Sequence, residues 1–356
     1  MMQDGIARIV EGVDLTKNEA EQIMGEIMTG KATGAQIAAF LTSLRMKGET
    51  IDEITALASV MRKFCCQIHP KVREKLVDTC GTGGDRIKTF NISTMAAFVA
   101  AGAGVPIAKH GNRSVTSCCG SADILEALGL NLKMAPDIVE KSIEEIGIGF
   151  MFAPNFHPAM KYAIGPRREI KIRTVFNLLG PLTNPANAKA QLLGVYGEYL
   201  TEPLAHVLDN LGVEQAMVIH GLDGLDEIST IGKTKITYLK QGEISTSYVN
   251  PEDFGVKTVD GKVLGGSSPE ESASMTYRIL NGHYSCVKGK EDPKLDIVLV
   301  NAAATIQVGG RAETIKEGME NARESIKSGY AYDKLKSLIR FSGGDLSKLE
   351  EMESYE

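Results

Sequence analysis

In Val77-Asp-Thr-Cys-Gly-Thr-Gly-Gly-Asp85, a short apolar strand runs into a glycine loop that ends on a carboxylate. Because glycine has no side chain, the backbone N–H groups of such a loop can turn inward and surround phosphate oxygens. A second polar stretch, Lys109-His-Gly-Asn-Arg113, follows the next predicted strand. In an open parallel sheet, the loops after neighbouring strands gather at one edge, where ligands bind. The two loops together predict a parallel α/β sheet and a substrate with more than one phosphate group.

Spacing excludes two better-known phosphate loops. The dinucleotide fingerprint G-x-G-x-x-G fails because its third glycine would fall at Arg86. The P-loop pattern G-x-x-x-x-G-K-[ST] occurs nowhere in the chain. The remaining alternative is a plain turn at residues 81–84, which the second loop and the motifs below disfavour.

Composition indicates an ordinary globular protein of 356 residues, 43% hydrophobic and 24% charged. A net charge of −6 disfavours a nucleic-acid surface, which normally carries a basic excess. No apolar run reaches the roughly 18 residues of a membrane span, and Met1-Met-Gln-Asp-Gly lacks the features of a signal peptide. The six cysteines show no C-x-x-C spacing, which disfavours a zinc site. We therefore expect a cytoplasmic protein with no membrane contact and no nucleic-acid partner.

Residues 1–70 show only helical patterns. Capping boxes open three amphipathic runs: Thr16 with Glu19, Thr33 with Gln36, and Thr50 with Glu53. Gly30 and Gly48 stand where helix ends would fall. We predict a small N-terminal helical domain that serves packing and dimerisation.

Beyond residue 70, strands alternate with helices. Strands are predicted at 76–77, 105–108, 192–195, 216–219 and 297–300. Helices are predicted at 93–102, 121–128, 201–211 and between 302 and 340. This alternation predicts an α/β fold, in which the small helical domain precedes a larger domain with a mainly parallel central sheet flanked by helices.

Two stretches lack a clear periodic pattern. The proline-rich segment 156–185 is predicted to be an irregular loop, and the acidic tail 345–356 to be frayed. The expected division places a helical domain at 1–70, to which residues 165–185 return, and an α/β substrate-binding domain at 71–164 and 186–356.

Polar residues at the strand ends are candidates for ligand binding. Ser93 and Thr94 either cap the helix after the glycine loop or hold a phosphate at its positive end. Asp226 and Glu227 follow the strand predicted at 216–219. Adjacent carboxylates suit Mg²⁺, which binds a few carboxylates together with substrate phosphates, although a solvated acidic turn has the same pattern.

The segment His157, Tyr162, Arg167 and Arg168 carries further polar groups. Arginine can pair bidentately with a carboxylate, so the segment suits an acidic aromatic substrate. No residue is assigned a certain catalytic role, and His157 is kept as a candidate. The chain contains no Ser–His–Asp, catalytic-cysteine or H-E-x-x-H pattern, so nothing in it calls for a covalent mechanism.

Eight motifs, taken in order, resemble those of the anthranilate phosphoribosyltransferases of tryptophan biosynthesis, and the resemblance covers nearly the whole chain. They are Gly81-Thr-Gly-Gly-Asp85, Asn91-Ile-Ser-Thr94, Lys109-His-Gly-Asn-Arg113, Gly120-Ser-Ala-Asp123, His157-Pro-Ala-Met160, Arg167-Arg-Glu169, Asn177-Leu-Leu-Gly-Pro-Leu-Thr-Asn-Pro185 and Asp226-Glu227. The resemblance implies two domains joined at a hinge, a homodimer through the helical domains, and Mg²⁺ as the cofactor, about two ions per chain.

The implied reaction moves phosphoribose from phosphoribosyl pyrophosphate (PRPP) to the amine of anthranilate and releases pyrophosphate. The implied PRPP-binding residues are Gly81, Gly84, Asp85, Thr89, Asn91, Ile92, Ser93, Thr94, Lys109, His110, Gly111, Asn112, Arg113, Ser114, Val115, Thr116, Ser117 and Ser121. The implied anthranilate-binding residues are Gly81, Asn112, His157, Tyr162, Arg167 and Pro181. The implied metal ligands are Ser93, Asp226 and Glu227.

Three alternatives stay open on sequence grounds. A pyrimidine-nucleoside phosphorylase would share the architecture and attack with phosphate. A phosphoribosyltransferase for another aromatic acid would keep the PRPP motifs and change segment 157–168. A non-catalytic nucleic-acid-binding relative would show a basic groove and tolerate the loss of Asp226-Glu227, and the acidic net charge and the intact pair disfavour it.

Overall fold

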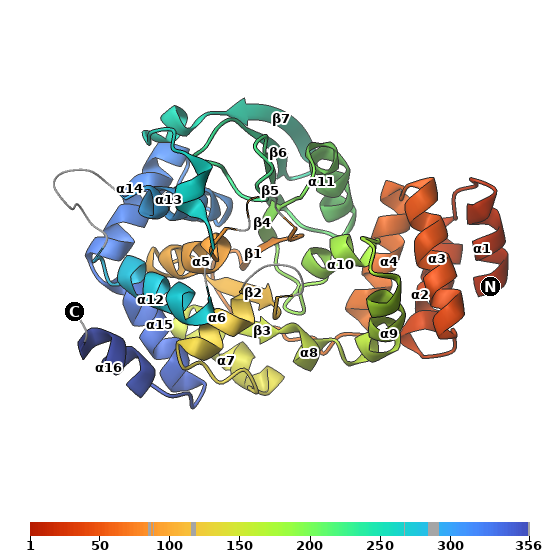
Figure 1. Ribbon diagram of the computed structural model, residues 1–356, viewed down its shortest axis with the longest axis horizontal. Coiled ribbons are helices and arrows are strands. Elements are labelled where there is room, and N and C mark those ends of the chain that lie inside the picture. The colour runs from red at the N-terminus through yellow and green to blue at the C-terminus, as the bar shows by residue number, and fades with distance from the viewer. Residues whose placement is uncertain (85–86, 88, 115–118, 267, 284–291, 355–356) are drawn as a thin grey trace.

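The structure, a computed structural model, describes residues 1–84, 87, 89–114, 119–266, 268–283 and 292–354. Figure 1 shows an N-terminal group of helices beside a larger body built around a sheet. The predicted fold class is therefore confirmed. Four residues of the predicted PRPP set, Asp85, Val115, Thr116 and Ser117, lie outside the described residues.

The helical unit begins the chain. Its helices are α1 (Met2–Val10), α2 (Lys17–Met28), α3 (Gly34–Lys47) and α4 (Ile51–Lys63). Each of the three predicted capping boxes is formed, with a threonine side chain accepting the N–H three residues on. Gly30 and Gly48 follow α2 and α3 with φ of +72° and +92°, a conformation that favours glycine. Local signals thus set where these helices begin and end.

The sheet of the larger unit has the order β3-β2-β1-β4-β5-β6-β7. Its strands are β1 (Val77–Gly81), β2 (Ile107–Gly111), β3 (Ile148–Phe152), β4 (Ala190–Gly194), β5 (Gln215–Gly221), β6 (Thr234–Lys240) and β7 (Glu243–Val249). Strands β1 to β5 pair in parallel, whereas β6 and β7 add antiparallel. The loops after β1, β2, β4 and β5 therefore leave from one edge of the sheet.

The remaining helices of the described part of the chain lie mostly around the sheet, whereas α9 lies beside the helical unit (Figure 1). They are α5 (Ile92–Gly102), α6 (Ser121–Ala127), α7 (Pro136–Ile146), α8 (Ala153–Phe156), α9 (Lys161–Ile170), α10 (Phe176–Leu182), α11 (Thr201–Asn210), α12 (Pro269–Leu280), α13 (Pro293–Val308), α14 (Ile315–Lys327), α15 (Tyr330–Phe341) and α16 (Ser347–Ser354). Short 3₁₀ turns lie at Pro158–Met160, Glu198–Leu200, Pro251–Phe254 and Gly261–Leu264. None of the helices within the described ranges is long and apolar enough to cross a membrane.

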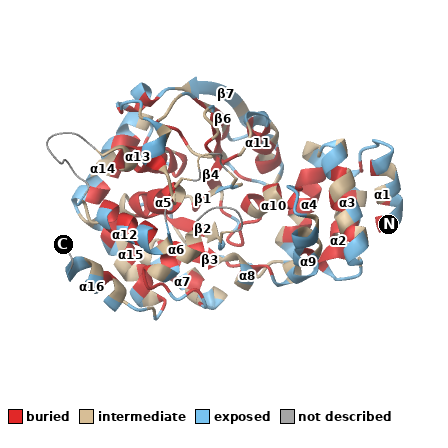
Figure 2. Ribbon diagram, viewed as in Figure 1, coloured by how far each residue is buried: buried red, intermediate tan, exposed pale blue. Residues whose placement is uncertain are grey.

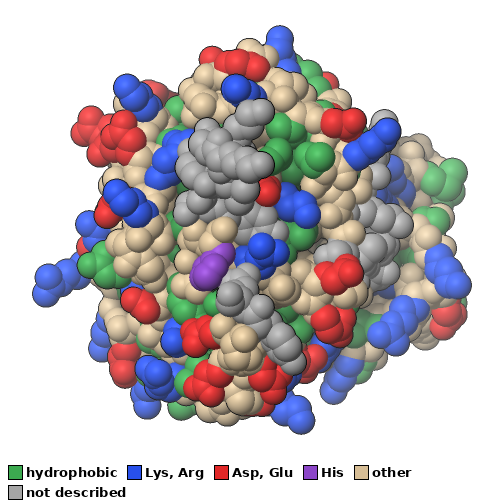
Figure 3. All heavy atoms as spheres, turned by 60° about the vertical axis from the view of Figure 1, so that its left-hand side comes forward, with side chains coloured by type: hydrophobic (Ala, Val, Ile, Leu, Met, Phe, Trp, Pro, Cys, Tyr) green, Lys and Arg blue, Asp and Glu red, His purple; other side chains and the backbone are tan. Residues whose placement is uncertain are grey.

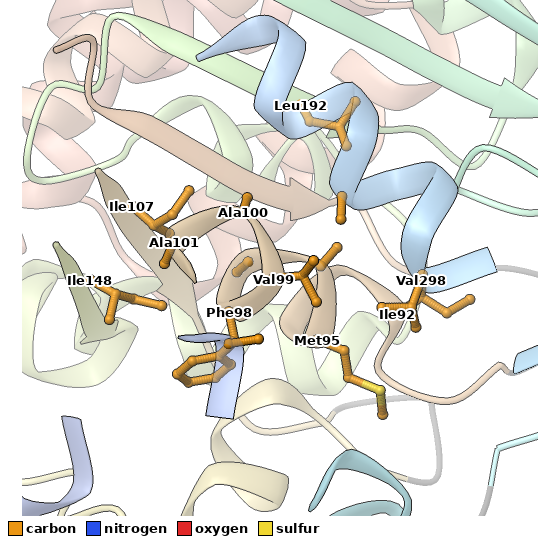
Figure 4. Close-up of a cluster of buried hydrophobic side chains, with 14 of the residues drawn as sticks. Ile92, Met95, Phe98, Val99, Ala100, Ala101, Ile107, Ile148, Leu192 and Val298 are labelled. Carbon is orange, nitrogen blue, oxygen red and sulfur yellow. The ribbon is translucent and has the colours of Figure 1, made fainter. Parts of the chain in front are cut away.

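Two cores lie on opposite faces of the sheet, because alternate residues of a strand point to opposite sides. Leu192 of β4 belongs to the core that surrounds α5 and α13, and its neighbour Leu193 belongs to the other. Figure 4 shows the α5 side, where Ala101 lies next to Ile107 of β2. Helices α5 and α13 are buried along most of their length (Figure 2), as expected of helices enclosed on every side.

The second core joins the helical unit to the sheet. It runs from α1–α4 through α10 and α11 to Leu193 and Val218, on β4 and β5. Helix α9 contacts α2 and α3, and α10 contacts α4. Since apolar packing continues across residue 70, the division at that residue, with 165–185 returning to the helical part, stays a prediction.

One predicted strand is wrong. Residues 297–300 lie in the middle of α13 and not in the sheet. The apolar run is buried on all sides, and a short, fully apolar run has no period that separates a strand from a buried helix. The sheet instead contains β3 and the β6–β7 hairpin, which we did not predict.

Three local expectations also need correction. Segment 156–185, predicted as an irregular loop, contains α9 and α10. The tail, predicted as frayed, forms α16, whose Leu349 is buried. Ser93 and Thr94 do not cap α5, because Asn91 occupies the N-cap and both residues lie in the first turn.

Candidate active site

The glycine loop after β1 is held by contacts at successive residues. Thr82 donates its N–H to the Gly194 carbonyl at 2.9 Å, and its hydroxyl accepts the Tyr196 N–H at 3.0 Å. Gly83 donates its N–H to Asp226 Oδ2 at 2.9 Å. Gly83 and Gly84 have φ of +68° and +87°, which explains the glycines at both positions. The glycines are thus required by the backbone conformation, and the cradling of phosphate by this loop stays a prediction.

Asp226 reaches the loop because two strand ends carry no side chain. Gly81 and Gly194 pair across β1 and β4. A Cβ on Gly81 would lie 2.7 Å from Asp226 Oδ2, and a Cβ on Gly194 would collide with the Asp226 carbonyl oxygen. The predicted acidic loop and the predicted glycine loop are therefore brought together at one edge of the sheet.

The start of α5 lies in the same place. The Ser93 N–H donates to Glu227 Oε1 at 3.2 Å. Lys109, 3% exposed, donates from Nζ to the Thr79 carbonyl at 2.7 Å and lies 3.4 Å from Ser93 Oγ. Burial lowers the pKa of Lys109, and the charges of Asp78, Cys80 and Glu227 oppose that shift. A buried cation thus lies beneath the helix start that we predicted to hold a phosphate.

Asn301, on α13, positions the acidic loop, and no signal in the sequence indicated this role. Its amide accepts the Ile228 N–H at 2.9 Å and donates to the Ile228 carbonyl at 3.0 Å. It is fully buried and also donates to the Ile297 carbonyl. On the other side of the loop, Asp223 accepts from Ser229 Oγ at 2.5 Å and from the Leu225 N–H at 3.1 Å. Both side chains fix the backbone that presents Asp226 and Glu227.

The half-buried His110, on β2, packs against the buried His157. The ring centroids of His110 and His157 are 5.0 Å apart. Burial lowers the pKa of His110 to about 3 and that of His157 to about 4, so both rings are neutral at pH 7. Within the described residues, the Nε2 atoms of both rings lack a hydrogen-bond partner. His157 is thus a weak base held in a fixed place.

The loop after β2 is built around α6. Asn112 accepts the Arg113 N–H at 2.8 Å through Oδ1, and its carbonyl accepts from Ser121 Oγ at 3.3 Å. Asp123 accepts the Ser114 N–H at 3.0 Å. The Arg113 guanidinium lies 3.0 Å from Asp123 and 2.7 Å from Glu126, and both carboxylates raise its pKa. In this conformation Arg113 is paired with α6.

Of the predicted anthranilate residues, Pro181 contacts β1, whereas Arg167 and Tyr162 lie on α9. The Pro181 carbonyl accepts from Gln191 Nε2 at 2.7 Å and from Cys80 Sγ at 3.9 Å, beside the strand that ends at the glycine loop. The half-buried Arg167 lies in the last turn of α9, over the Phe176 ring at 5.0 Å, and burial lowers its pKa. Tyr162 lies farther out, 39% exposed and packed on Gly30 of the helical unit.

The remaining predicted PRPP residues line the same edge. Thr89 pairs with Gly265 in an isolated bridge, and Asn91 donates to the Cys119 carbonyl at 3.1 Å. Ile92 and Thr94 are buried in the first turn of α5. A Cβ on Gly111 would press on the Phe150 ring. Among the described residues, no group of three or more His, Cys, Asp or Glu side chains could hold a metal ion.

Gly194→Ala tests the close approach of Asp226. The methyl group must displace the Asp226 backbone, so we expect the free energy of unfolding in urea to fall by about 1–3 kcal/mol. We expect pyrophosphate affinity in the presence of Mg²⁺, measured by calorimetry, to fall at least about tenfold. Gly25→Ala in α2, where a Cβ meets nothing within 4 Å, is the control and should be neutral or stabilising. Wild-type stability and affinity in Gly194→Ala would contradict the assignment.

Comparison with known proteins places the chain in a family. The model of the glycosyl transferase family α/β domain matches residues 73–332, and that of the family's helical bundle domain matches residues 3–65. An anthranilate phosphoribosyltransferase from Alkaliphilus metalliredigens (strain QYMF) is 52% identical over 342 residues, which cover 96% of this chain and 98% of the relative.

Solved structures agree with that result. The crystal structure of anthranilate phosphoribosyltransferase from Thermus thermophilus superimposes with a TM-score of 0.88 at 40% identity, covering 95% of this chain and 99% of the other. The enzyme from Saccharomyces cerevisiae in complex with PRPP and Mg has a TM-score of 0.88 at 27% identity, covering 96% and 98%. The chain belongs to the glycosyl transferase family with a helical bundle and an α/β domain, and within it to the anthranilate phosphoribosyltransferases.

Proposed function

We propose that the protein transfers the phosphoribosyl group of PRPP to the amine of anthranilate and releases pyrophosphate, as in tryptophan biosynthesis. One observation carries the proposal: the glycine-loop N–H of Gly83 and the helix-start N–H of Ser93 point at a pair of carboxylates, Asp226 and Glu227. Backbone donors of this kind bind phosphate, and adjacent carboxylates bind the metal that accompanies it. The relative from Alkaliphilus, which shares 52% identity across nearly its full length, carries the name of this enzyme.

The chemistry needs positioning more than a strong base. The bond between ribose C1 and the pyrophosphate oxygen breaks, and the leaving group keeps the electron pair. The anthranilate nitrogen forms the new bond to C1 and then releases one proton. Positive charge develops on the ribose and negative charge on pyrophosphate. Backbone N–H groups and Lys109 can stabilise the negative charge. An aromatic amine is already a neutral nucleophile, so a weak base such as His157, with a pKa of about 4, fits the reaction.

The metal part of the proposal rests on the donor set at the sheet edge. Asp226 and Glu227 are half-buried and lie against the loop and the helix that would bind phosphate oxygens. Together with Ser93 they would hold Mg²⁺, with about two ions per chain when PRPP is present. Bound there, Mg²⁺ supplies positive charge next to the leaving pyrophosphate. The yeast relative was solved in complex with PRPP and Mg, which supports this assignment.

We assign the PRPP side to the loops after β1 and β2 and the anthranilate side to the segment from His157 to Pro181. Asn112 would reach both substrates from the end of β2, and Gly81 from the end of β1. Arg167, half-buried with a guanidinium that no described carboxylate pairs, suits the carboxylate of anthranilate. His157, Tyr162 and Pro181 would line the path by which anthranilate arrives.

A single assay tests the function. Protein, PRPP, Mg²⁺ and anthranilate are mixed, and the loss of anthranilate fluorescence is followed. Turnover of uridine or thymidine with phosphate would point to a nucleoside phosphorylase, and turnover of another aromatic acid would change the acceptor.

On the face in Figure 3, acidic and basic side chains are interspersed rather than gathered into one basic patch. A filter-binding assay that shows tight nucleic-acid binding without turnover would overturn the enzymatic proposal.

The double variant Asp226→Asn, Glu227→Gln tests the metal assignment. Both substitutions keep shape and hydrogen-bond acceptors and remove two charges that offset Mg²⁺. We expect normal folding, a much higher Mg²⁺ requirement and a kcat lower by about 10²-fold or more, since metal stabilisation is worth several kcal/mol. A Mg²⁺ titration of activity with a melting curve measures both. The control is the double variant Glu350→Gln, Glu351→Gln at an exposed pair on α16, which should titrate like wild type. If the Asp226→Asn, Glu227→Gln variant also titrates like wild type, the metal assignment is wrong.

Arg167→Ala tests the anthranilate side. Loss of a charge-assisted pair costs about 1.5–3 kcal/mol, so we expect kcat/KM for anthranilate to fall by about one to two decades. PRPP affinity, measured by calorimetry, should stay close to wild type. The control is Arg340→Ala, an exposed arginine in the last turn of α15. A collapse of PRPP affinity in Arg167→Ala would contradict the assignment.

We also propose that the protein forms a homodimer through its helical unit. Large apolar side chains are exposed there: Val10 is 70% exposed and Met46 83% exposed, on α1 and α3, which contact each other. Small helical bundles expose more apolar surface than they can bury alone, and such surface marks interaction sites.

A charge on this surface should separate the subunits. We expect Met46→Glu to give monomers in light scattering, because the interface would have to bury an unpaired carboxylate. Tyr330→Glu, on an apolar side chain that is 59% exposed at the start of α15, should leave the mass unchanged. Monomeric wild-type protein at micromolar concentration would refute the proposal.

A further inference from the structure

Arg173 lies on the short connection between α9 and α10 and contacts the glycine loop. We propose that Arg173 is a positioning residue that couples the two substrate sites, because it holds Gly84 from the same connection that follows Arg167. The proposal rests on the function proposed above and adds a communication between PRPP and anthranilate binding.

The contact with Gly84 is specific to arginine and to glycine. Arg173 Nη2 donates to the Gly84 carbonyl at 2.8 Å, and the guanidinium carbon lies 4.5 Å from the centre of the Tyr196 ring. A Cβ on Gly84 would collide with the guanidinium, and its φ of +87° already favours glycine. A planar guanidinium can stack flat on the ring while it donates at its edge, whereas a lysine ammonium is a point charge without that flat face and fork of donors.

Tyr196 joins this contact to the rest of the loop. Its N–H donates to Thr82 Oγ1 at 3.0 Å, while its ring supports Arg173. The Thr82 N–H in turn donates to the Gly194 carbonyl at 2.9 Å. The end of β4 and Tyr196 just after it therefore contact the beginning of the glycine loop directly, and Tyr196 contacts Gly84 indirectly through Arg173.

The other end of the connection carries the anthranilate arginine. Arg167 lies in the last turn of α9, which ends where Lys171 takes a φ of +51° and donates its N–H to the Arg167 carbonyl at 3.3 Å. The Arg167 guanidinium lies over the ring of Phe176, which is the first residue of α10. Arg167 thus stacks on Phe176 just before the 171–175 connection, and Arg173 stacks on Tyr196 from within that connection. A change in the position of Gly84 would reach Arg167 through these few residues.

The physical consequence is mutual support of the two substrates. PRPP bound in the glycine loop orders Gly84, and Gly84 orders Arg173 and the connection behind it. Anthranilate bound to Arg167 orders the same connection from the other end. Since coupling between two sites is reciprocal, each substrate should tighten the binding of the other in the wild-type protein.

The test compares Arg173→Ala and Arg173→Lys with a matched control. Arg311→Ala is that control: Arg311 Nε donates to the carbonyl of Gly104 at 3.2 Å, and Gly104 has a φ of +88°, so an arginine again contacts a left-handed glycine at the opposite edge of the sheet. The partner of its guanidinium is Glu74 at 2.7 Å, where Arg173 has the Tyr196 ring. The KM for anthranilate is measured at a series of PRPP concentrations. PRPP affinity is measured by calorimetry with Mg²⁺, and loop protection by hydrogen exchange over residues 77–90.

We expect Arg173→Ala to weaken PRPP binding by about tenfold, to raise loop exchange and to abolish the dependence of the anthranilate KM on PRPP, with an unchanged melting temperature. Arg173→Lys should recover part of the PRPP affinity and little of the coupling. Arg311→Ala should match wild type in all three measurements. The proposal is overturned if Arg173→Ala keeps the wild-type coupling and loop protection, or if its defects only follow a lowered melting temperature.

These outcomes are separate from a failure of the proposed function. If wild-type protein does not consume anthranilate, the function fails, and calorimetry with PRPP and hydrogen exchange still measure the hold of Arg173 on Gly84. If wild-type protein turns over and Arg173→Ala is indistinguishable from Arg311→Ala, the function stands and the coupling role of Arg173 is wrong.

Discussion

The site depends on one close approach: the Asp226 loop contacts the ends of β1 and β4 where neither strand has a side chain. Gly81 and Gly194 are paired across the two strands, and a methyl group on either would meet Asp226. With those two positions empty, the carboxylate reaches the N–H of Gly83 at 2.9 Å. The adjacent Glu227 then meets the start of α5. Backbone donors from the connection between β1 and α5 and acidic groups from the loop after β5 thus converge on a single spot.

Burial shifts the pKa values of the basic side chains near this spot. Lys109 lies beneath the loop with its ammonium on the Thr79 carbonyl, and nearby carboxylates partly offset the effect of burial on its pKa. His110 and His157 are neutral, so they add shape and dipoles without adding charge. Among the described residues, the charged groups that contact the glycine loop or lie beneath it include Lys109, the acidic pair and Arg173, which donates to the Gly84 carbonyl. This pattern suits a site that stabilises a departing anion by fixed groups and needs no strong base.

The helical unit takes part in the site through packing. The second core runs from α1–α4 through α10 and α11 into one face of β4 and β5. Helix α9, which carries Arg167, lies on α2 and α3, while the connection after it reaches the glycine loop through Arg173. Apolar contacts on one side and polar contacts on the other therefore fix where this arginine-bearing segment lies between the two parts of the chain.

Local signals in the sequence determined the parts of this protein whose stabilising partners lie a few residues away. The capping boxes of α2–α4, the presence of β1, β2, β4 and β5, and the position of the glycine loop all follow from side chains within one turn or one strand, although each of these strands starts one or two residues from its predicted start. The apolar run 297–300 failed because burial on every side removes the period that separates helix from strand. Only the tertiary structure decided the long-range contacts. Gly83 and Asp226 are 143 residues apart, and Gly84 and Arg173 are 89 apart. No local pattern spans such distances, because these pairs form only after the sheet has brought its loops to one edge.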